Sequence, residues 1–157
     1  MALPRFVYRG VGASMHVRDA GRLAPKAPGL IETSFARDGS VPRTRGGDPR
    51  DLGATRSPSV TNTVLKQQLR QAGYPTCGVS TTPCQENARR YALHSEADGY
   101  VYVIDTAKLP TAKVMACPVL EFVPVPSVPG DEEVVLFAED GGALPPEIIV
   151  EVIRVSR

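Results

Sequence analysis

The chain has 157 residues and a formal net charge of +1, with 42% hydrophobic and 22% charged residues. This size and composition are typical of one folded domain of about 100–150 residues and exclude a disordered tail. No apolar run approaches the ~18 residues that a membrane span needs, and the start of the chain lacks the apolar stretch of a signal peptide. We therefore expect a single soluble domain over residues 1–157, with no membrane partner.

Charge is unevenly distributed along the chain. Residues 1–70 contain 12 Lys or Arg against 5 Asp or Glu, whereas residues 71–157 contain 6 against 12. A basic half suits an anionic ligand such as a dinucleotide or a nucleic acid, and an acidic half suits a carboxylate-based site that faces it. Two solvated faces that attract each other on folding would give the same pattern, so charge alone leaves both interpretations open.

The first predicted element is a strand at Phe6–Gly10, an aromatic and apolar stretch that carries Arg9 near its end. Val17–Leu23 predicts a short helix. Proline and glycine then punctuate the chain, which predicts a long loop that is rich in Arg, Gly and Pro over about residues 36–57. Its arginines fit either a solvated loop or a surface that contacts a target.

Two helices are predicted in the middle of the chain. Ser57-Pro58 supplies an N-cap and a first helical residue, and apolar side chains then keep to one face until Gly73 ends the helix. Tyr74–Thr81 predicts a short strand. The segment Thr82-Pro83-Cys84-Gln85 has the capping-box pattern, so the strand should lead directly into a second helix that ends near Ser95.

The rest of the chain predicts strands. Gly99–Asp105 is rich in β-branched and aromatic residues and should lie centrally in a sheet. Val114–Val123 predicts another strand. Glu133–Phe137 and Ile148–Val155 predict two antiparallel strands around a turn at Gly141-Gly142. Early helices followed by strands indicate an α+β fold.

The chain contains three cysteines, Cys77, Cys84 and Cys117. They lack CxxC or Cys/His spacing, so neither a metal site nor a disulfide framework is predicted, while a bridge between the first two stays open. His16 is expected in a loop and His94 at a helix end, both with structural roles. Tyr100 and Tyr102 share one face of a strand, which favours packing over ligand binding.

Four patches stand in a particular order: an aromatic strand ending in arginine, a strand reaching Ser-Thr-Thr that enters a helix, the strand GYVYVIDTA, and an acidic loop leading into EEVVLF and ALPPEIIVEVIRV. Together they resemble the catalytic subunits of cholera and pertussis toxins. The similarity spans most of residues 6–155 but is absent from Gly12 to about Ser57. It implies a mono-ADP-ribosyltransferase domain in which early helices pack on a split, antiparallel-rich β core.

The resemblance also implies a set of site residues. The family shares an arginine on the first strand, a serine/threonine motif and a glutamate before the penultimate strand, which correspond by position to Arg9, Ser80-Thr81-Thr82 and Glu133. In the family the arginine holds the phosphates of NAD and the glutamate binds the ribose 2′-hydroxyl. Arg9 and the three motif residues are therefore expected to bind NAD, and Glu133 and Asp131 are expected to be catalytic.

These residue types also have ordinary structural interpretations. Arg9 suits phosphates because its planar fork donates bidentate hydrogen bonds, but the same fork could pair with a surface carboxylate. Thr82 is expected to cap a helix whatever the function. Ser80 is expected to orient Glu133 rather than to act as a nucleophile, because no histidine/acid arrangement is present to activate it.

The acidic run suggests how the acceptor is chosen. Strand-like alternation should place Asp131 and Glu133 on one face with Glu132 turned away, although a solvated acidic turn is the usual fate of such a run. Two neighbouring carboxylates suit a reaction in which one stabilises positive charge and the other accepts a proton. In the family, arginine-modifying members carry Glu at the position of Asp131, and several members that act on other acceptors carry Gln. Asp131 keeps the acid but is one methylene shorter than Glu, so the resemblance favours an arginine acceptor on a protein.

The sequence thus predicts a transferase with NAD as ADP-ribose donor, no metal, and NAD glycohydrolysis as a side activity. The resemblance implies a toxin or effector of bacterial virulence or competition, secreted or delivered into a target-cell cytoplasm, with an immunity or inhibitor protein as a further partner. Transfer to structured RNA is the alternative within the enzyme class, because its phosphates would explain the loop arginines. A catalytically silent transferase-like interaction module is the alternative outside it.

Overall fold

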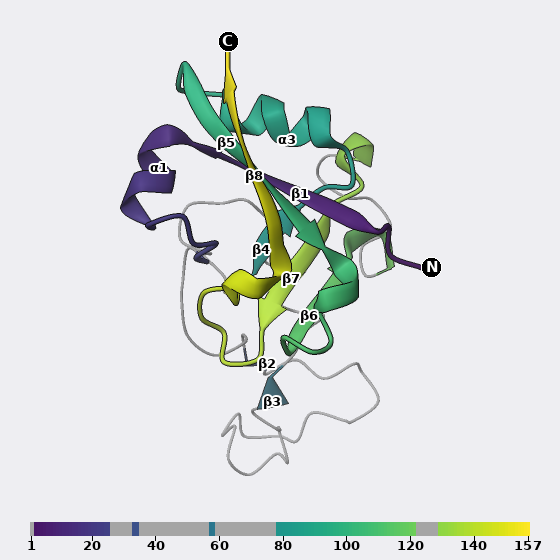
Figure 1. Ribbon diagram of the computed structural model, residues 1–157. Coiled ribbons are helices and arrows are strands. Elements are labelled where there is room, and N and C mark those ends of the chain that lie inside the picture. Colours follow the sequence, from purple (N-terminus) through teal and green to yellow (C-terminus); the bar gives the residue numbers. More distant parts are fainter. Residues whose placement is uncertain (1, 26–32, 35–56, 59–77, 122–128) are drawn as a thin grey trace, which may run out of the picture.

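The computed structural model describes residues 2–25, 33–34, 57–58, 78–121 and 129–157. Within these residues the chain forms an α+β fold with two three-stranded antiparallel sheets, one two-stranded pair and two α-helices (Figure 1), which confirms the predicted fold class. In the same residues no helix is long and apolar enough to cross a membrane.

The first sheet has the order β1-β5-β8. Its strands are β1 (Phe6–Gly12), β5 (Asp98–Asp105) and β8 (Ile149–Ser156), and every pairing is antiparallel. The prediction that β5 is central is confirmed. Strand β1 runs two residues beyond its predicted end, so Arg9 lies in mid-strand, where it pairs with Tyr102.

The second sheet has the order β4-β7-β6. Its strands are β4 (Val79–Thr81), β7 (Val134–Ala138) and β6 (Val114–Pro118), and all five residues of β7 are buried. Strand β6 ends earlier than predicted because its last residue is a proline, after which the chain turns into the 3-10 helix η2 (Val119–Glu121). The predicted end of that strand, at Val123, lies outside the described residues.

The predicted antiparallel pairing of the last two strands is wrong. Strand β7 pairs with β4 and β6, whereas β8 pairs with β5 in the other sheet. Between them the chain turns at Gly141, which has a φ of 70°, and passes through Pro145 and the 3-10 helix η4 (Pro146–Ile148). Consecutive prolines lack the amide donors that a hairpin ladder needs, so the segment crosses between sheets instead of folding back.

Helix α1 also differs from its prediction, because it covers Ala13–Arg18 and not Val17–Leu23. Its start is held by a distant residue: the Glu96 carboxylate accepts hydrogen bonds from the backbone N and the Oγ of Ser14, at 3.0 and 2.9 Å. Such contacts satisfy amides that a helix start leaves unpaired. The helix ends at Arg18, and the chain then turns through Ala20 and Gly21, which have positive φ values of 53° and 74°; only the glycine adopts that conformation without steric cost.

The segment Ser57-Pro58 is a strand and not a helix start. It forms β3 (Ser57–Pro58), which pairs antiparallel with β2 (Thr33–Ser34). The residue before a proline is pushed toward extended geometry, so the same dipeptide fits a strand as well as a helix start. The rest of the predicted helix, residues 36–56 of the predicted loop, and residues 74–77 of the predicted strand lie outside the described residues.

Helix α3 (Gln85–Ala92) packs on the outer face of the first sheet and ends short of its predicted end. Ala88 and Ala92 are buried, one turn apart, against glycines of β1 and β5. A Cβ atom at Gly10 would lie 1.8 Å from the Ala88 carbonyl oxygen, and one at Gly99 would lie 2.7 Å from that of Ala92. The absence of side chains at both positions therefore lets the helix approach the sheet.

The hydrophobic core fills the space between the two sheets. Alternation along β1 puts Val7, Arg9 and Val11 on the inner face, while the glycine that faces α3 points outward. The buried cluster takes side chains from both sheets, among them Val7, Tyr102, Ile104, Val79, Val134 and Leu136. Arg9 thus enters a largely apolar interface, where its charge requires polar partners.

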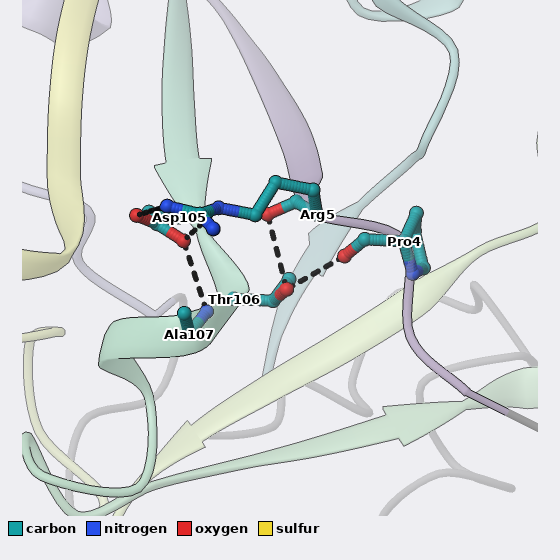
Figure 2. A network of polar contacts seen from close by, with 5 residues as sticks. All are labelled: Pro4, Arg5, Asp105, Thr106 and Ala107. Carbon is teal, nitrogen blue, oxygen red and sulfur yellow. Dashed lines mark hydrogen bonds and ion pairs between the residues drawn. The ribbon is translucent and has the colours of Figure 1, made fainter.

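A polar network ties the start of the chain to the end of β5 (Figure 2). Arg5 donates from Nη2 to Asp105 Oδ2 at 3.0 Å, the Ala107 amide donates to Asp105 Oδ1 at 3.0 Å, and the Thr106 hydroxyl donates to the Pro4 carbonyl at 2.6 Å. Desolvation raises the pKa of Asp105, but the Ala107 amide and Arg5 outweigh it, so the pKa is lowered overall. The ionised carboxylate therefore anchors the start of β1.

Candidate active site

The site lies where the two sheets meet. Tyr8 of β1 and Thr82, just beyond β4, form an isolated antiparallel bridge. The Tyr8 amide donates to the Thr82 carbonyl at 2.7 Å, and the Thr82 amide donates to the Tyr8 carbonyl at 2.9 Å. Because Arg9 follows Tyr8, this bridge places the predicted arginine next to the predicted Ser-Thr-Thr motif.

The ladder between β4 and β7 brings in the predicted glutamate. Thr81 pairs with Val134, so Thr82 and Glu133 come next to each other immediately beyond the last pair. The Glu133 carbonyl accepts a hydrogen bond from the Val119 amide at 2.9 Å, which fixes this backbone on its other side. The register therefore brings three sequence-distant candidates, an arginine, a threonine and a glutamate, to one junction.

Arg9 is half-buried and donates from Nη1 to the Ser80 carbonyl oxygen at 3.1 Å. Desolvation lowers the pKa of Arg9, while the Glu133 carboxylate and the Tyr91 phenol act in the opposite direction. The guanidinium nevertheless stays charged, because arginine is not deprotonated in proteins. The junction thus holds a permanent cation close to an acidic side chain.

Thr82 holds the acidic turn and is not the predicted helix cap. The N-cap residue of α3 is Cys84, which makes no side-chain capping hydrogen bond, and Gln85 is the first helical residue. The Thr82 hydroxyl instead accepts from the Cys84 amide at 3.1 Å and donates to the Asp131 carbonyl oxygen at 2.6 Å. The capping-box prediction is wrong because the helix begins two residues later than the box requires, so the Thr82 hydroxyl precedes the N-cap and bonds the Cys84 amide and the acidic turn.

The other two motif residues also contact the neighbouring elements. The hydroxyl of Thr81 is buried and donates to the carbonyl oxygen of Val134 at 2.7 Å, which fastens β4 to β7. Ser80 pairs with Val135 in the same ladder and offers its carbonyl to Arg9. The structure thus gives Ser80 a backbone role, while the predicted orientation of Glu133 by its hydroxyl stays a prediction.

Asp131 and Glu133 lie on one side of the acidic run and Glu132 on the other, as predicted, but the backbone differs from the predicted strand. Asp131 is 6% exposed and Glu133 is 9% exposed, whereas Glu132 is exposed to solvent. A solvated acidic turn would leave all three outside, so that interpretation is wrong. The chain is not extended here: the 3-10 helix η3 (Pro129–Asp131) precedes Glu132, whose φ of 48° is left-handed. That turn, and not strand alternation, buries both carboxylates.

Two residues of α3 reach this turn and were missed by the sequence analysis. The Tyr91 hydroxyl donates to Asp131 Oδ2, and Asn87 donates from Nδ2 to the Gly130 carbonyl oxygen at 3.2 Å. They are one helical turn apart, so both side chains lie on the same face of the helix. A tyrosine within the polar stretch QENARRYA, four residues after an asparagine, is the local signal that could have indicated them.

A second polar cluster flanks Arg9 on the inner face of the sheet. His16 lies in α1, not in the predicted loop, and its ring stacks on Tyr100 with centroids 3.8 Å apart. His16 Nδ1 also hydrogen-bonds the hydroxyl of Tyr102, the strand partner of Arg9. Burial raises the pKa of Tyr102, and the charge of Asp19 adds to that effect. The predicted packing role of the tyrosine pair is thus extended to a contact with α1.

The described thiols differ in their surroundings. Cys84 is free and exposed, and Cys117 is free and buried, with burial raising its pKa to about 11. Cys77, the suggested bridging partner of Cys84, lies outside the described residues. Across the ranges that the structure describes, no group of three His, Cys, Asp or Glu side chains could hold a metal ion.

A protein-family model, NarE, matches residues 6–136. The chain belongs to the NarE family. NarE proteins form an ADP-ribosyltransferase-like family, which implies NAD as a substrate. The match includes Arg9, the Ser-Thr-Thr motif and Glu133, and it ends within β7. A search of curated proteins finds no match.

Proposed function

We propose that this NarE-family protein is a mono-ADP-ribosyltransferase of the cholera/pertussis-toxin class, which transfers ADP-ribose from NAD to a macromolecular acceptor. The observation that carries the proposal is the meeting of Arg9, the Ser80-Thr81-Thr82 strand end and Glu133 at the bridge between the two sheets. These polar residues are far apart in sequence, and the stability of the fold does not by itself require them to lie together. A cation beside a buried carboxylate fits a ligand that has phosphates and ribose hydroxyls.

On this proposal different residues of the junction bind different parts of NAD. A guanidinium carries five donors, of which the Ser80 carbonyl engages one, and its planar fork matches phosphate oxygens. Arg9 would therefore hold the phosphates of NAD, with Ser80 to Thr82 beside the nicotinamide ribose. Thr81 and Thr82 contribute mainly through the two buried hydroxyl contacts that keep β4 and the acidic turn in place.

The two buried carboxylates have different tasks. Cleavage of the nicotinamide–ribose bond passes through an oxocarbenium-like state, as in glycoside hydrolysis, and a fixed carboxylate stabilises that developing positive charge. The burial of Glu133 close to Arg9 supports this role for Glu133. Asp131 accepts a proton from the attacking acceptor. When water is the acceptor, the outcome is NAD glycohydrolysis.

The finer assignments follow from the resemblance. A protein arginine is the favoured acceptor because Asp131 stands where arginine-modifying relatives carry an acid. The proposed setting is a toxin or effector that acts in another cell and is restrained by an immunity protein. The arginine-rich loop that motivated the RNA alternative lies outside the described residues. RNA as acceptor is therefore an outcome of the test below, and so is the silent interaction module.

The test uses the purified protein with labelled NAD and a cell lysate. Glu133→Gln is compared with Glu132→Gln. The control removes the same charge from the neighbouring residue, whose side chain is exposed. We expect the wild type and Glu132→Gln to label macromolecules and release nicotinamide, and Glu133→Gln to lose both by a factor of at least about 100, the usual scale for one electrostatic group.

Protease and ribonuclease treatment then identify the acceptor. Label that is lost to protease indicates a protein, and label that is lost to ribonuclease indicates RNA. If the folded wild type releases no nicotinamide and NAD causes no thermal shift, the transferase proposal fails and the interaction module replaces it. Equal activity of the two variants would also refute the role of Glu133.

A further inference from the structure

Tyr91 occupies a position between the two charged halves of the site. Its hydroxyl donates a hydrogen bond to the carboxylate of Asp131, and its phenol contributes to the electrostatic environment of Arg9. Tyr91 is 45% exposed, whereas Asp131 is only 6% exposed. Tyr91 thus reaches the buried acid with its hydroxyl while the residue as a whole stays half-exposed to solvent.

The contacts on the acidic turn differ in what they hold. Asn87 donates to the Gly130 carbonyl oxygen and Thr82 donates to that of Asp131, so both fix the backbone. Tyr91 contacts the carboxylate itself. With the backbone already held, the hydrogen bond from Tyr91 sets the direction in which the second carboxylate oxygen points.

We propose that Tyr91 serves the acceptor side of the reaction: its hydroxyl positions Asp131 to receive the acceptor's proton, and its exposed ring stacks on a guanidinium acceptor. This inference rests on the proposed transferase function. A planar guanidinium stacks on aromatic faces and pairs with carboxylates, and both groups are adjacent here. A ring and an acid side by side therefore favour an arginine-type acceptor over a hydroxyl.

The step balances as follows. The bond between ribose C1′ and the nicotinamide nitrogen breaks, and its electron pair leaves with neutral nicotinamide. A guanidinium nitrogen forms the new bond to C1′, and the proton that it loses passes to the Asp131 carboxylate. A protonated guanidinium has no free lone pair until it gives up this proton, whereas water attacks with its own lone pair and releases its proton afterwards, to Asp131 or to solvent. Transfer should therefore depend on Tyr91 more than hydrolysis does.

The experiment separates the two reactions in the full chain. Agmatine serves as a small guanidine acceptor, and fluorescent etheno-NAD reports hydrolysis in its absence. Tyr91→Phe removes the hydroxyl and keeps the ring, and Tyr91→Leu removes both. Glu86→Gln is the control, since it changes an exposed side chain of the same helix that pairs with Arg89 and not with the acidic turn.

We expect Tyr91→Phe to lower kcat for agmatine modification about tenfold, equivalent to about 1.4 kcal/mol, while hydrolysis changes by less than about threefold. Tyr91→Leu should also raise the KM for agmatine, because the stacking surface is lost. In an Asp131→Ala background, Tyr91→Phe should have no further effect on transfer, because the hydroxyl acts through that carboxylate.

The outcomes separate this inference from the function it rests on. A wild type that neither hydrolyses etheno-NAD nor modifies agmatine refutes the transferase. An active wild type whose Tyr91→Phe variant loses hydrolysis and transfer in equal proportion, or loses neither, refutes the role of Tyr91 and leaves the transferase standing. Thermal unfolding of each variant excludes loss of fold as the cause, and Tyr91→Phe should unfold within a few degrees of the wild type because the side chain is half-exposed.

Discussion

Replacement of Thr82 by valine tests whether this residue holds the acidic turn. Valine keeps the shape of threonine but removes the hydroxyl that donates to the Asp131 carbonyl oxygen at 2.6 Å and accepts from the Cys84 amide at 3.1 Å. Thr82 and Asp131 are buried, so the Asp131 carbonyl does not gain full access to water in exchange, whereas the Cys84 amide belongs to an exposed residue. Each lost hydrogen bond of this kind costs about 1–2 kcal/mol, so Thr82→Val should lower the free energy of unfolding by about 2–4 kcal/mol.

The assay is chemical unfolding together with a thermal scan. For a domain of this size the loss corresponds to a fall in Tm of roughly 5–15 °C. Thr82→Ser is the control, because it keeps the hydroxyl and removes one methyl group, which costs about 1 kcal/mol or less. ADP-ribose transfer by Thr82→Val should also fall at 25 °C, where the protein stays folded, because the turn that carries Asp131 has lost its hydrogen bond to residue 82. Equal stabilities of Thr82→Val and Thr82→Ser would refute the reasoning.

Three further predictions test the surrounding fold. Alkylation at about pH 8 should modify the exposed Cys84 and spare the buried Cys117, because a pKa of about 11 keeps Cys117 a protonated thiol. Peptide mass spectrometry measures the labelling, and equal labelling of the two cysteines would contradict this prediction. Gly10→Ala should lower the free energy of unfolding by more than about 2 kcal/mol in denaturant titrations, because its methyl would lie 1.8 Å from the Ala88 carbonyl; an unchanged value would place α3 farther away. The lowered pKa of Asp105 means that its stabilisation is present above its unfolded-state pKa of about 3.9 and is lost as pH falls through the lower folded-state value. A pH series of Tm values should therefore fall less steeply in acid for Asp105→Asn than for the wild type, and parallel curves would rule this out.

The predicted strands show which features of the fold are determined by the local sequence. Gly99–Asp105 was predicted almost to its bounds because β-branched and aromatic residues favour a buried strand wherever it pairs. The same rule found Ile148–Val155 and Glu133–Phe137 but paired them with each other, whereas they belong to different sheets. Strand pairing depends on contacts across the chain that apolar patterning does not specify. Helix α1 failed for the same reason, since its start depends on the remote Glu96.

The site was predictable where the backbone itself brings residues together. Arg9 and Glu133 were placed by family resemblance, and the bridge at Thr82 and the β4–β7 register account for their convergence. The partners of Asp131 were not predictable from local sequence. A turn with a left-handed Glu132 buries this acid, and the hydroxyl that contacts it comes from a helix forty residues earlier in the chain.

Helix α3 links the packing of the first sheet to the geometry of the acidic turn. Its alanines at 88 and 92 contact the glycines of β1 and β5, while the adjacent positions, Asn87 and Tyr91, hold the turn that carries Asp131. A rigid helix cannot shift on one face without moving the other. Gly10→Ala should therefore reduce transfer to agmatine as well as stability, although Gly10 lies on the opposite face of β1 from Arg9. If that variant loses stability but keeps full transfer at 25 °C, the turn is held independently of α3, and the positioning role of Tyr91 loses its structural basis.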